Sequence, residues 1–214
     1  SLHVALRIYA GTGPEPGPLT NMPTVLTRAA GVNMRIIKIC TAGVTLERLT
    51  ISGGYMDSGN GGGLSVTGAC SVIISNCIFA GNGFAYAARG GGLYANGGIL
   101  TVVDTLFANN YISADSENEK LGGGVAAENT TSTFTRCSFL SNYLRLRHGN
   151  AFGGAAYLYG GNVTFAECAF KTNSVVGYQF AAQPRAGALY AVDVNPLAIQ
   201  SCSVSANYAQ GPNQ

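Results

Sequence analysis

The chain has 214 residues, of which 47% are hydrophobic and only 10% charged, with 30 glycines, no tryptophan and a net charge of +2. This composition excludes a disordered chain, which would be rich in charge and poor in aromatic and β-branched residues. The small charge and the lack of a Lys/Arg run argue against nucleic acid as a partner. No apolar stretch is long enough for a transmembrane helix. The six cysteines and two histidines lack metal-site spacing, so we expect no metal and no cofactor.

The first 35 residues do not fit the pattern of the rest of the chain. LHVALRIYAG, at residues 2–11, predicts an early strand, and a Pro-rich loop follows it. GTGPEPG within that loop predicts a turn rather than a phosphate-binding loop, because it has two prolines and no following Lys. We therefore expect an N-terminal segment over 1–35, a repeat domain over 36–208 and a tail over 209–214 that continues into a longer chain.

Two signals recur from residue 61 onward in repeats of about thirty residues. A Gly-rich signal begins each repeat, as GGGL at 61–64 and 90–93, GGGV at 122–125, GGAA at 153–156 and AGAL at 186–189. A closing signal follows at a nearly constant distance, as FAGN at 79–82, FANN at 107–110, FLSN at 139–142, FKTN at 170–173 and VSAN at 204–207. Residues 44–51 fit one earlier repeat.

The residues between the two signals alternate between apolar and polar, which is typical of strands. Short strands that repeat every thirty residues or so predict an all-β, single-stranded, right-handed parallel β-helix (β-solenoid) of about six to seven coils. The right hand follows from the general preference for right-handed crossovers.

Residues at the same repeat position should stack from coil to coil. The expected stacks are an apolar one of Phe79, Phe107, Phe139 and Phe170, an amide ladder of Asn82, Asn110, Asn142, Asn173 and Asn207, and an inward column of Cys77, Cys137, Cys168 and Cys202. Cys40 and Cys70 lie outside this column, near one corner of adjacent coils. A disulfide between them stays open, and with it the redox compartment.

The pairing of a GGA[ILV]-type signal with FxxN resembles the repeat of the polymorphic outer membrane proteins, over residues 61–207 and more loosely over 37–54. Here the first three repeats have GGGL or GGGV, and the last two signals are degenerate. The resemblance implies a right-handed β-helix at the cell surface that acts in adhesion.

All variation in repeat length lies between the ladder Asn and the next Gly-rich signal, so we expect loops that collect at one corner of the helix. These segments hold many aromatic and Arg side chains, which are common anchors at interfaces. The candidate binding residues are Phe84, Tyr86, Arg89, Tyr111, Tyr143, Arg145, Arg147, His148, Phe152, Tyr178, Phe180 and Arg185. The alternative is that these side chains only cover the coil edges.

An enzyme that cleaves polysaccharides is the second hypothesis, because glycoside hydrolysis needs two nearby carboxylates. Asp104 and Glu167 share an outward column, but Arg136 lies between them, which favours a charge ladder. His148–Gly149 and the RIIK stretch at 35–38 resemble motifs of pectin hydrolases but stand in the wrong order. We therefore expect no catalysis. Asn129 and Asn162 begin N-glycosylation sequons.

The sequence thus predicts a non-catalytic extracellular or cell-surface protein that acts in adhesion or structural assembly. Its expected partners are surface glycans or other protein subunits, with end-to-end self-association through the open coil ends. The alternatives are a carbohydrate-active β-helix enzyme and a structural spacer in a filament or appendage.

Overall fold

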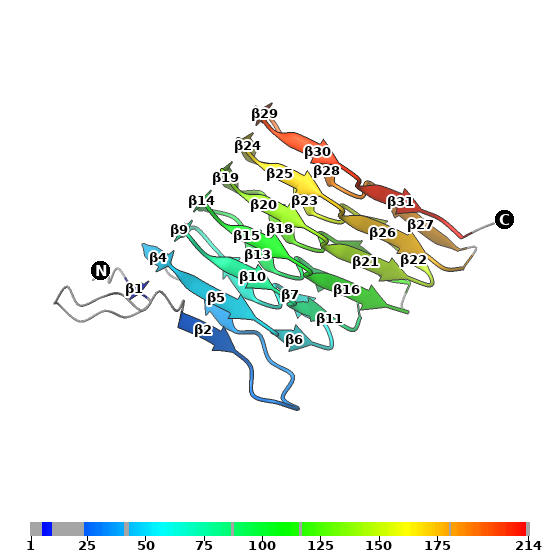
Figure 1. Ribbon diagram of the computed structural model, residues 1–214, viewed down its shortest axis with the longest axis horizontal. Helices are drawn as coiled ribbons and strands as arrows, with labels where there is room; N and C mark the ends of the chain where they lie inside the picture. The colour runs from blue at the N-terminus through cyan, green and yellow to red at the C-terminus, as the bar shows by residue number, and fades with distance from the viewer. Residues whose placement is uncertain are drawn as a thin grey trace.

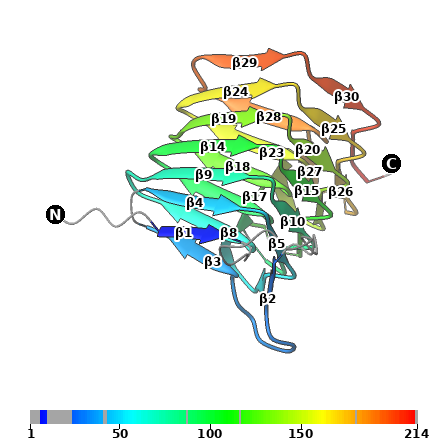
Figure 2. The same cartoon turned by 60° about the vertical axis from the view of Figure 1, so that its left-hand side comes forward.

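The protein is an all-β structure in which short strands wind into stacked coils (Figure 1). The computed structural model describes residues 6–9, 24–40, 43–86, 88–115, 117–179 and 181–212. These residues contain no helix, and therefore none that could cross a membrane. Figure 2 shows the coils lying one above another from β1 and β4 to β29.

The strands form five parallel sheets, A to E. Sheet A consists of β1 (Leu6–Tyr9), β4 (Val44–Glu47), β9 (Ser71–Ser75), β14 (Ile99–Val103), β19 (Thr131–Thr135), β24 (Asn162–Ala166) and β29 (Leu197–Gln200). Sheet B consists of β2 (Thr24–Thr27), β5 (Leu49–Ser52), β10 (Ile78–Ala80), β15 (Leu106–Ala108), β20 (Ser138–Leu140), β25 (Ala169–Lys171) and β30 (Ser203–Ser205). Sheet C consists of β6 (Tyr55–Met56), β11 (Gly83–Phe84), β16 (Tyr111–Ala114), β21 (Tyr143–Leu146), β26 (Ser174–Gly177) and β31 (Tyr208–Gln210).

The other two sheets complete each coil. Sheet D consists of β3 (Ile37–Ile39), β8 (Leu64–Thr67), β13 (Leu93–Asn96), β18 (Val125–Glu128), β23 (Ala156–Tyr159) and β28 (Leu189–Val192). Sheet E consists of β7 (Gly59–Asn60), β12 (Ala88–Arg89), β17 (Lys120–Leu121), β22 (Gly149–Phe152) and β27 (Ala182–Arg185). Five coils pass through all five sheets in the order A, B, C, E, D, and partial coils flank them. The predicted parallel β-helix is confirmed.

The main core lies between sheets A, B and D, where inward side chains stack in register. Phe79, Phe107, Phe139 and Phe170 form the predicted stack, with ring centroids 5.0, 5.1 and 4.7 Å apart along the column. Phe134 and Phe165 on sheet A form a second stack at 4.9 Å, edge-on to Phe139. These rings fill the centre of the coils with apolar surface.

The cysteines are all free thiols. Cys77, Cys137 and Cys168 are buried in the predicted inward column, and each thiol donates to a backbone carbonyl of the preceding coil. Cys202 continues the column at a half-buried position. Cys40 is exposed and Cys70 is buried, so the disulfide considered between them is not formed in this structure.

The ladder of Asn side chains is present, and it is buried except at Asn207, which is half-buried. Asn110 Nδ2 donates to Asn142 Oδ1 at 3.0 Å and to the Phe79 carbonyl at 2.9 Å, and the other ladder residues repeat this pattern. The Gly-rich signal packs directly against the ladder, since a Cβ on Gly92 would lie 2.9 Å from the Asn110 side chain. Asn and Gly therefore recur at a fixed distance because they touch across the coil.

The segments expected to be loops form strands instead. In each complete coil they make one strand of sheet C and one of sheet E. They gather on one side of the helix as predicted, but largely as strands rather than as loops. Figure 1 shows sheet C continuing the line of sheet B, with β22 and β27 behind it. A second core lies between these two sheets and consists mainly of Phe84, Ala88, Ile112, Ala114, Leu144, Leu146, Ala151, Val175 and Ala182. We call this two-sheet projection the arm.

The polar column of Asp104, Arg136 and Glu167 occupies the turn between sheets A and B. All three residues have positive φ, from 49° to 56°, so they are corner residues rather than outward strand residues. Arg136 Nε lies 2.7 Å from Asp104 Oδ1. Glu167, like Asp104, raises the pKa of Arg136, although the hydrogen bond to Asp104 is the main cause. The Asp104–Arg136 pair of the predicted charge ladder is present as an ion pair across coils.

Candidate binding groove

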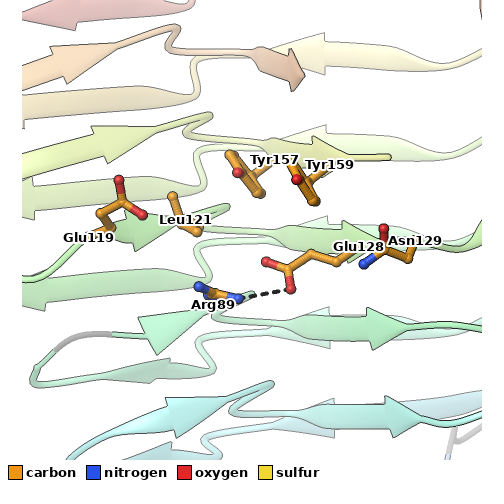
Figure 3. A pocket seen from close by; sticks show the side chains of 7 residues that line it. All are labelled: Arg89, Glu119, Leu121, Glu128, Asn129, Tyr157 and Tyr159. Atoms are coloured by element: carbon orange, nitrogen blue, oxygen red, sulfur yellow. Dashed lines mark hydrogen bonds and ion pairs between the residues drawn. The ribbon is translucent and has the colours of Figure 1, made fainter. Parts of the chain in front are cut away.

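A hollow lies where sheet E of the arm meets the outer face of sheet D (Figure 3). Two adjoining pockets of about 350 and 340 Å³ share Arg89 and Glu119, and we call them together the side groove. The first pocket is lined by Arg89, Glu119, Leu121, Glu128, Asn129, Tyr157 and Tyr159. The second is lined by Gly59, Asn60, Ala88, Arg89, Asn118 and Glu119. Both are open to solvent.

The register of the coils sets the residues on the sheet D wall. One outward column runs Ser65, Tyr94, Ala126, Tyr157 and Tyr190, and a second runs Thr67, Asn96, Glu128, Tyr159 and Val192. Ala126 is the small residue between two tyrosines. Figure 3 shows the Glu128 side chain reaching back along β18 toward Arg89, which the small side chain at position 126 permits.

Glu128 is the polar centre of the first pocket, with a side chain only 7% exposed. Its Oε2 accepts a hydrogen bond from Arg89 Nη1 at 2.9 Å and another from the Tyr94 hydroxyl at 3.0 Å. Within the described part of the chain, no group donates to the second oxygen, Oε1. Figure 3 shows this oxygen turned into the pocket, on the side of Leu121 and Glu119. A buried carboxylate with one open oxygen is well placed to accept a hydrogen bond from a ligand.

The charges of the pocket shift the pKa of its neighbours. Burial raises the pKa of Tyr94, and the negative charge of Glu128 raises it further. Burial also raises the pKa of Tyr157, with added repulsion from Glu128 and Glu119. Burial lowers the pKa of Arg89, but Glu128 and Tyr94 outweigh this effect, so the net pKa is raised. Both tyrosines therefore remain protonated donors in neutral solution.

An aromatic cluster continues the groove beyond the first pocket. The Tyr157 and Tyr190 rings are parallel, with centroids 6.1 Å apart, and Tyr190 contacts Phe152 at 4.6 Å. The Arg185 guanidinium lies over the Phe152 ring at 5.8 Å. Tyr157 lines the first pocket, and Tyr190 extends the aromatic surface to the next coil.

The predicted binding residues do not gather at one place. Arg89 lines the side groove, and Phe152 and Arg185 lie at its aromatic end. Tyr111 and Tyr143 stack on sheet C at 5.3 Å, and Arg145 lies over Tyr143. Other predicted residues lie elsewhere or outside the described residues: Tyr86, Arg147 and Tyr178 are exposed, His148 is half-buried, and Phe180 is not described.

The prediction of Phe84 as a binding residue is wrong. It is fully buried in the second core, so it cannot serve as an exposed anchor. Lys120, on the next coil, is also buried and donates to the His148 carbonyl at 2.9 Å. The arm is thus a packed structural unit, and only its outer faces are available to a partner.

Five acids and tyrosines of the groove were not predicted as binding residues from the sequence: Tyr94, Glu119, Glu128, Tyr157 and Tyr159. Four of them stand on sheet D immediately after the Gly-rich signal, at alternate positions. Their alternate positions in the sequence could have predicted that these side chains point outward from one face of a strand. No sequence pattern predicts the bend that brings sheet E against sheet D. Asp104 and Glu167, considered there as acids, lie at the A–B corner and not in the groove.

The two sequon residues are exposed. Asn129 lines the first pocket, directly after β18, while Asn162 begins β24. A glycan on Asn129 would therefore cover the pocket.

Comparison with known proteins supports the fold assignment. The family model described as "right handed beta helix region" matches residues 35–213, which includes the five complete coils. No curated protein and no solved structure is significantly similar to the chain. The family contains enzymes and non-enzymes, so membership does not assign an activity. The chain belongs to the right-handed β-helix family.

Proposed function

We propose that the chain is a non-catalytic extracellular β-helix that binds glycans through the side groove and acts in adhesion. The observation that carries this proposal is Glu128, a buried carboxylate whose free oxygen faces an open pocket beside Tyr157. Sugars offer hydroxyl donors and apolar ring faces, which a fixed carboxylate and an aromatic side chain complement. The resemblance of the repeats to those of the polymorphic outer membrane proteins supports the adhesion role and the cell-surface location.

The shape of the groove also favours a polymer. Coils of a β-helix lie about 4.8 Å apart, which is close to the length of one sugar ring, so an extended glycan along the axis meets one coil per sugar. Tyr157 on β23 and Tyr190 on β28 lie in register on neighbouring coils, so they are the two rings that such a glycan meets in turn. Aromatic side chains bind sugar rings with little loss of conformational entropy because they have only two side-chain torsions.

A glycan array followed by calorimetry tests this proposal. We expect Tyr157→Ala to weaken binding of the selected glycan by tenfold or more, and Glu128→Gln to weaken it while preserving the fold. Tyr86→Ala removes an exposed ring that lies outside the groove and is the matched control. Equal binding by all three variants and the parent protein would place the site elsewhere.

A carbohydrate-active enzyme is the second candidate, because Glu119 and Glu128 line the same pocket. Paired carboxylates are the usual requirement for glycoside hydrolysis. Against this role, Arg89 and Tyr94 both donate to one oxygen of Glu128 and hold it in a structural contact. New reducing ends released from a bound glycan by the parent protein, and lost in Glu119→Gln, would establish the enzyme.

A further inference from the structure

The first pocket of the side groove carries an excess of negative charge. Glu128 and Glu119 contribute two carboxylates to the first pocket, and Arg89 contributes one cation. Arg89 contacts only Oε2 of Glu128. Among the described residues, no cationic side chain pairs with Glu119. The pocket therefore has one uncompensated negative charge and one open carboxylate oxygen.

The surroundings of Glu119 and Glu128 support an uncompensated negative charge in the first pocket. Burial is the main cause of the raised pKa of Tyr157, and the charges of Glu128 and Glu119 raise it further. Both acids line the first pocket together with Tyr157. Three other cationic side chains contact different parts of the protein. Lys120, between Glu119 and Leu121 in the sequence, is buried and donates to the His148 carbonyl. Arg35 donates to the backbone carbonyls of Asn60 and Gly61, and Arg185 lies over Phe152. A cationic group on the ligand would complete the pocket, placed between two carboxylates and beside an aromatic ring.

We propose that the first pocket selects a sugar that carries a free, protonated amino group, within a glycan of amino sugars. This inference rests on the proposed glycan-binding function and names the class of ligand. The ammonium group donates to Glu128 Oε1 and interacts with Glu119, while the sugar ring packs against Tyr157. An N-acetylated sugar has no charge at this position and brings a bulky acyl group against the two acids, so it is disfavoured.

A metal ion or a peptide fits the pocket less well. Among the described residues, no group of three His, Cys, Asp or Glu side chains lies close enough to hold a metal, and hard cations such as Ca²⁺ require six or more oxygen ligands. A bound peptide usually pairs its backbone with an exposed strand edge. The groove walls offer no such edge, because β12, β17, β18 and β23 are each paired on both sides.

The test compares glucosamine oligosaccharides with their fully N-acetylated counterparts of equal length, measured by calorimetry at a pH where the amine is protonated. The parent protein should bind the free-amine form at least tenfold more tightly. Glu119→Gln should reduce this preference several-fold, and since Glu119 is exposed, this variant keeps the fold even if Glu128→Gln does not. Tyr86→Ala should retain the full preference.

The outcomes separate this inference from the function on which it rests. Equal affinity for both forms, with loss of both in Tyr157→Ala, would overturn amine selection and leave glycan binding intact. No binding of any oligosaccharide would overturn both proposals. Binding of oligolysine, but not of glucosamine oligomers, would show that the acids recognise a basic peptide, and would also overturn the inference.

Discussion

Arg89 and Glu128 come from neighbouring coils and from different sheets, yet their side chains meet at 2.9 Å at the base of an open groove. Arg89 ends β12 in the arm, and Glu128 ends β18 on the main body. Their contact therefore ties the arm to the main β-helix. It also fixes one oxygen of a buried carboxylate and leaves the other available to a ligand.

The pKa of Tyr94 reports directly on this network. We expect Glu128→Gln to lower the pKa of Tyr94, because it removes a nearby negative charge, and Arg89→Gln to raise it, because it removes a nearby positive one. NMR titration of ¹³C-labelled tyrosine measures both changes. A change of the Tyr94 pKa in the same direction in both variants would contradict the placement of Tyr94 between Glu128 and Arg89.

The raised pKa of Tyr94 also has a consequence for stability in alkali. Tyr94 is neutral when protonated, and the fold favours that form. Its contribution is fully present below the ordinary tyrosine pKa of about 10 and is lost as the pH rises through the higher pKa of the folded protein. We expect Tyr94→Phe to flatten the fall in the free energy of unfolding above pH 10. The free energy of unfolding is measured by urea denaturation at a series of pH values. The same pH dependence in Tyr94→Phe as in the parent protein would contradict this prediction.

The ladder of Asn side chains is expected to be a major source of stability. Asn110→Ala removes an acceptor for Asn82 and donors to Asn142 and Phe79, and leaves buried polar groups without partners. The expected loss is about 3 kcal/mol, since each unsatisfied buried group costs about 1–3 kcal/mol. Urea denaturation measures it.

The neighbouring Asn109 provides the control for this prediction. It is exposed and has a φ of 54°, a conformation that glycine adopts readily. Asn109→Gly should therefore leave the free energy of unfolding within about 0.5 kcal/mol of the parent protein. Similar losses in both variants would show that the ladder is not specifically stabilising.

The Phe stack should contribute to a similar degree. Phe139 contacts Phe107, Phe170, Phe134 and Phe165, so Phe139→Ala opens a cavity that closely packed coils cannot fill. The expected loss is about 3–5 kcal/mol. Tyr86→Ala, at an exposed position, should change stability by less than about 0.5 kcal/mol. A loss below about 1 kcal/mol for Phe139→Ala would contradict the packed core.

Thiol reactivity tests the cysteine assignment. Cys40 is exposed, Cys202 is half-buried, and the other four thiols are buried. We expect Ellman's reagent to modify Cys40 rapidly in the native protein, and the buried thiols only after unfolding. Cys40→Ser should remove the fast phase. A native protein without a fast thiol, and with a mass two daltons below that of the reduced chain, would show that Cys40 is in a disulfide.

The core positions of the β-helix could be predicted from the sequence because each carries a signal with a local physical cause. Phe107 and Phe139 occupy the same position in successive repeats, and Asn110 follows at a fixed distance. Stacking in register then fixes the fold, since identical side chains must lie above one another. The partial coils at both ends could not be bounded in this way, because their repeat signals are weak.

The groove could not be predicted, because it depends on how two sheets meet. Glu119 and Glu128 stand on opposite sides of a Gly-rich signal, and only the bend at Gly122 brings them to one pocket. In the segments that vary in length, buried and exposed residues were also difficult to distinguish from the sequence. Phe84 and Arg89 belong to one such segment, yet one is buried in the arm and the other lines the groove. Short strands of two residues leave too little alternation to distinguish them from loops.

The most direct test of the central claim is to map the tyrosines that respond to a bound glycan. The chain has 11 tyrosines, and ¹³C-labelled rings can be followed by NMR as a glucosamine oligosaccharide is added. The account predicts shifts for Tyr157, Tyr159 and Tyr94, with no change for Tyr111 and Tyr143 on sheet C. Shifts at Tyr111 and Tyr143, with Tyr157 unchanged, would contradict it and place the binding surface on the arm.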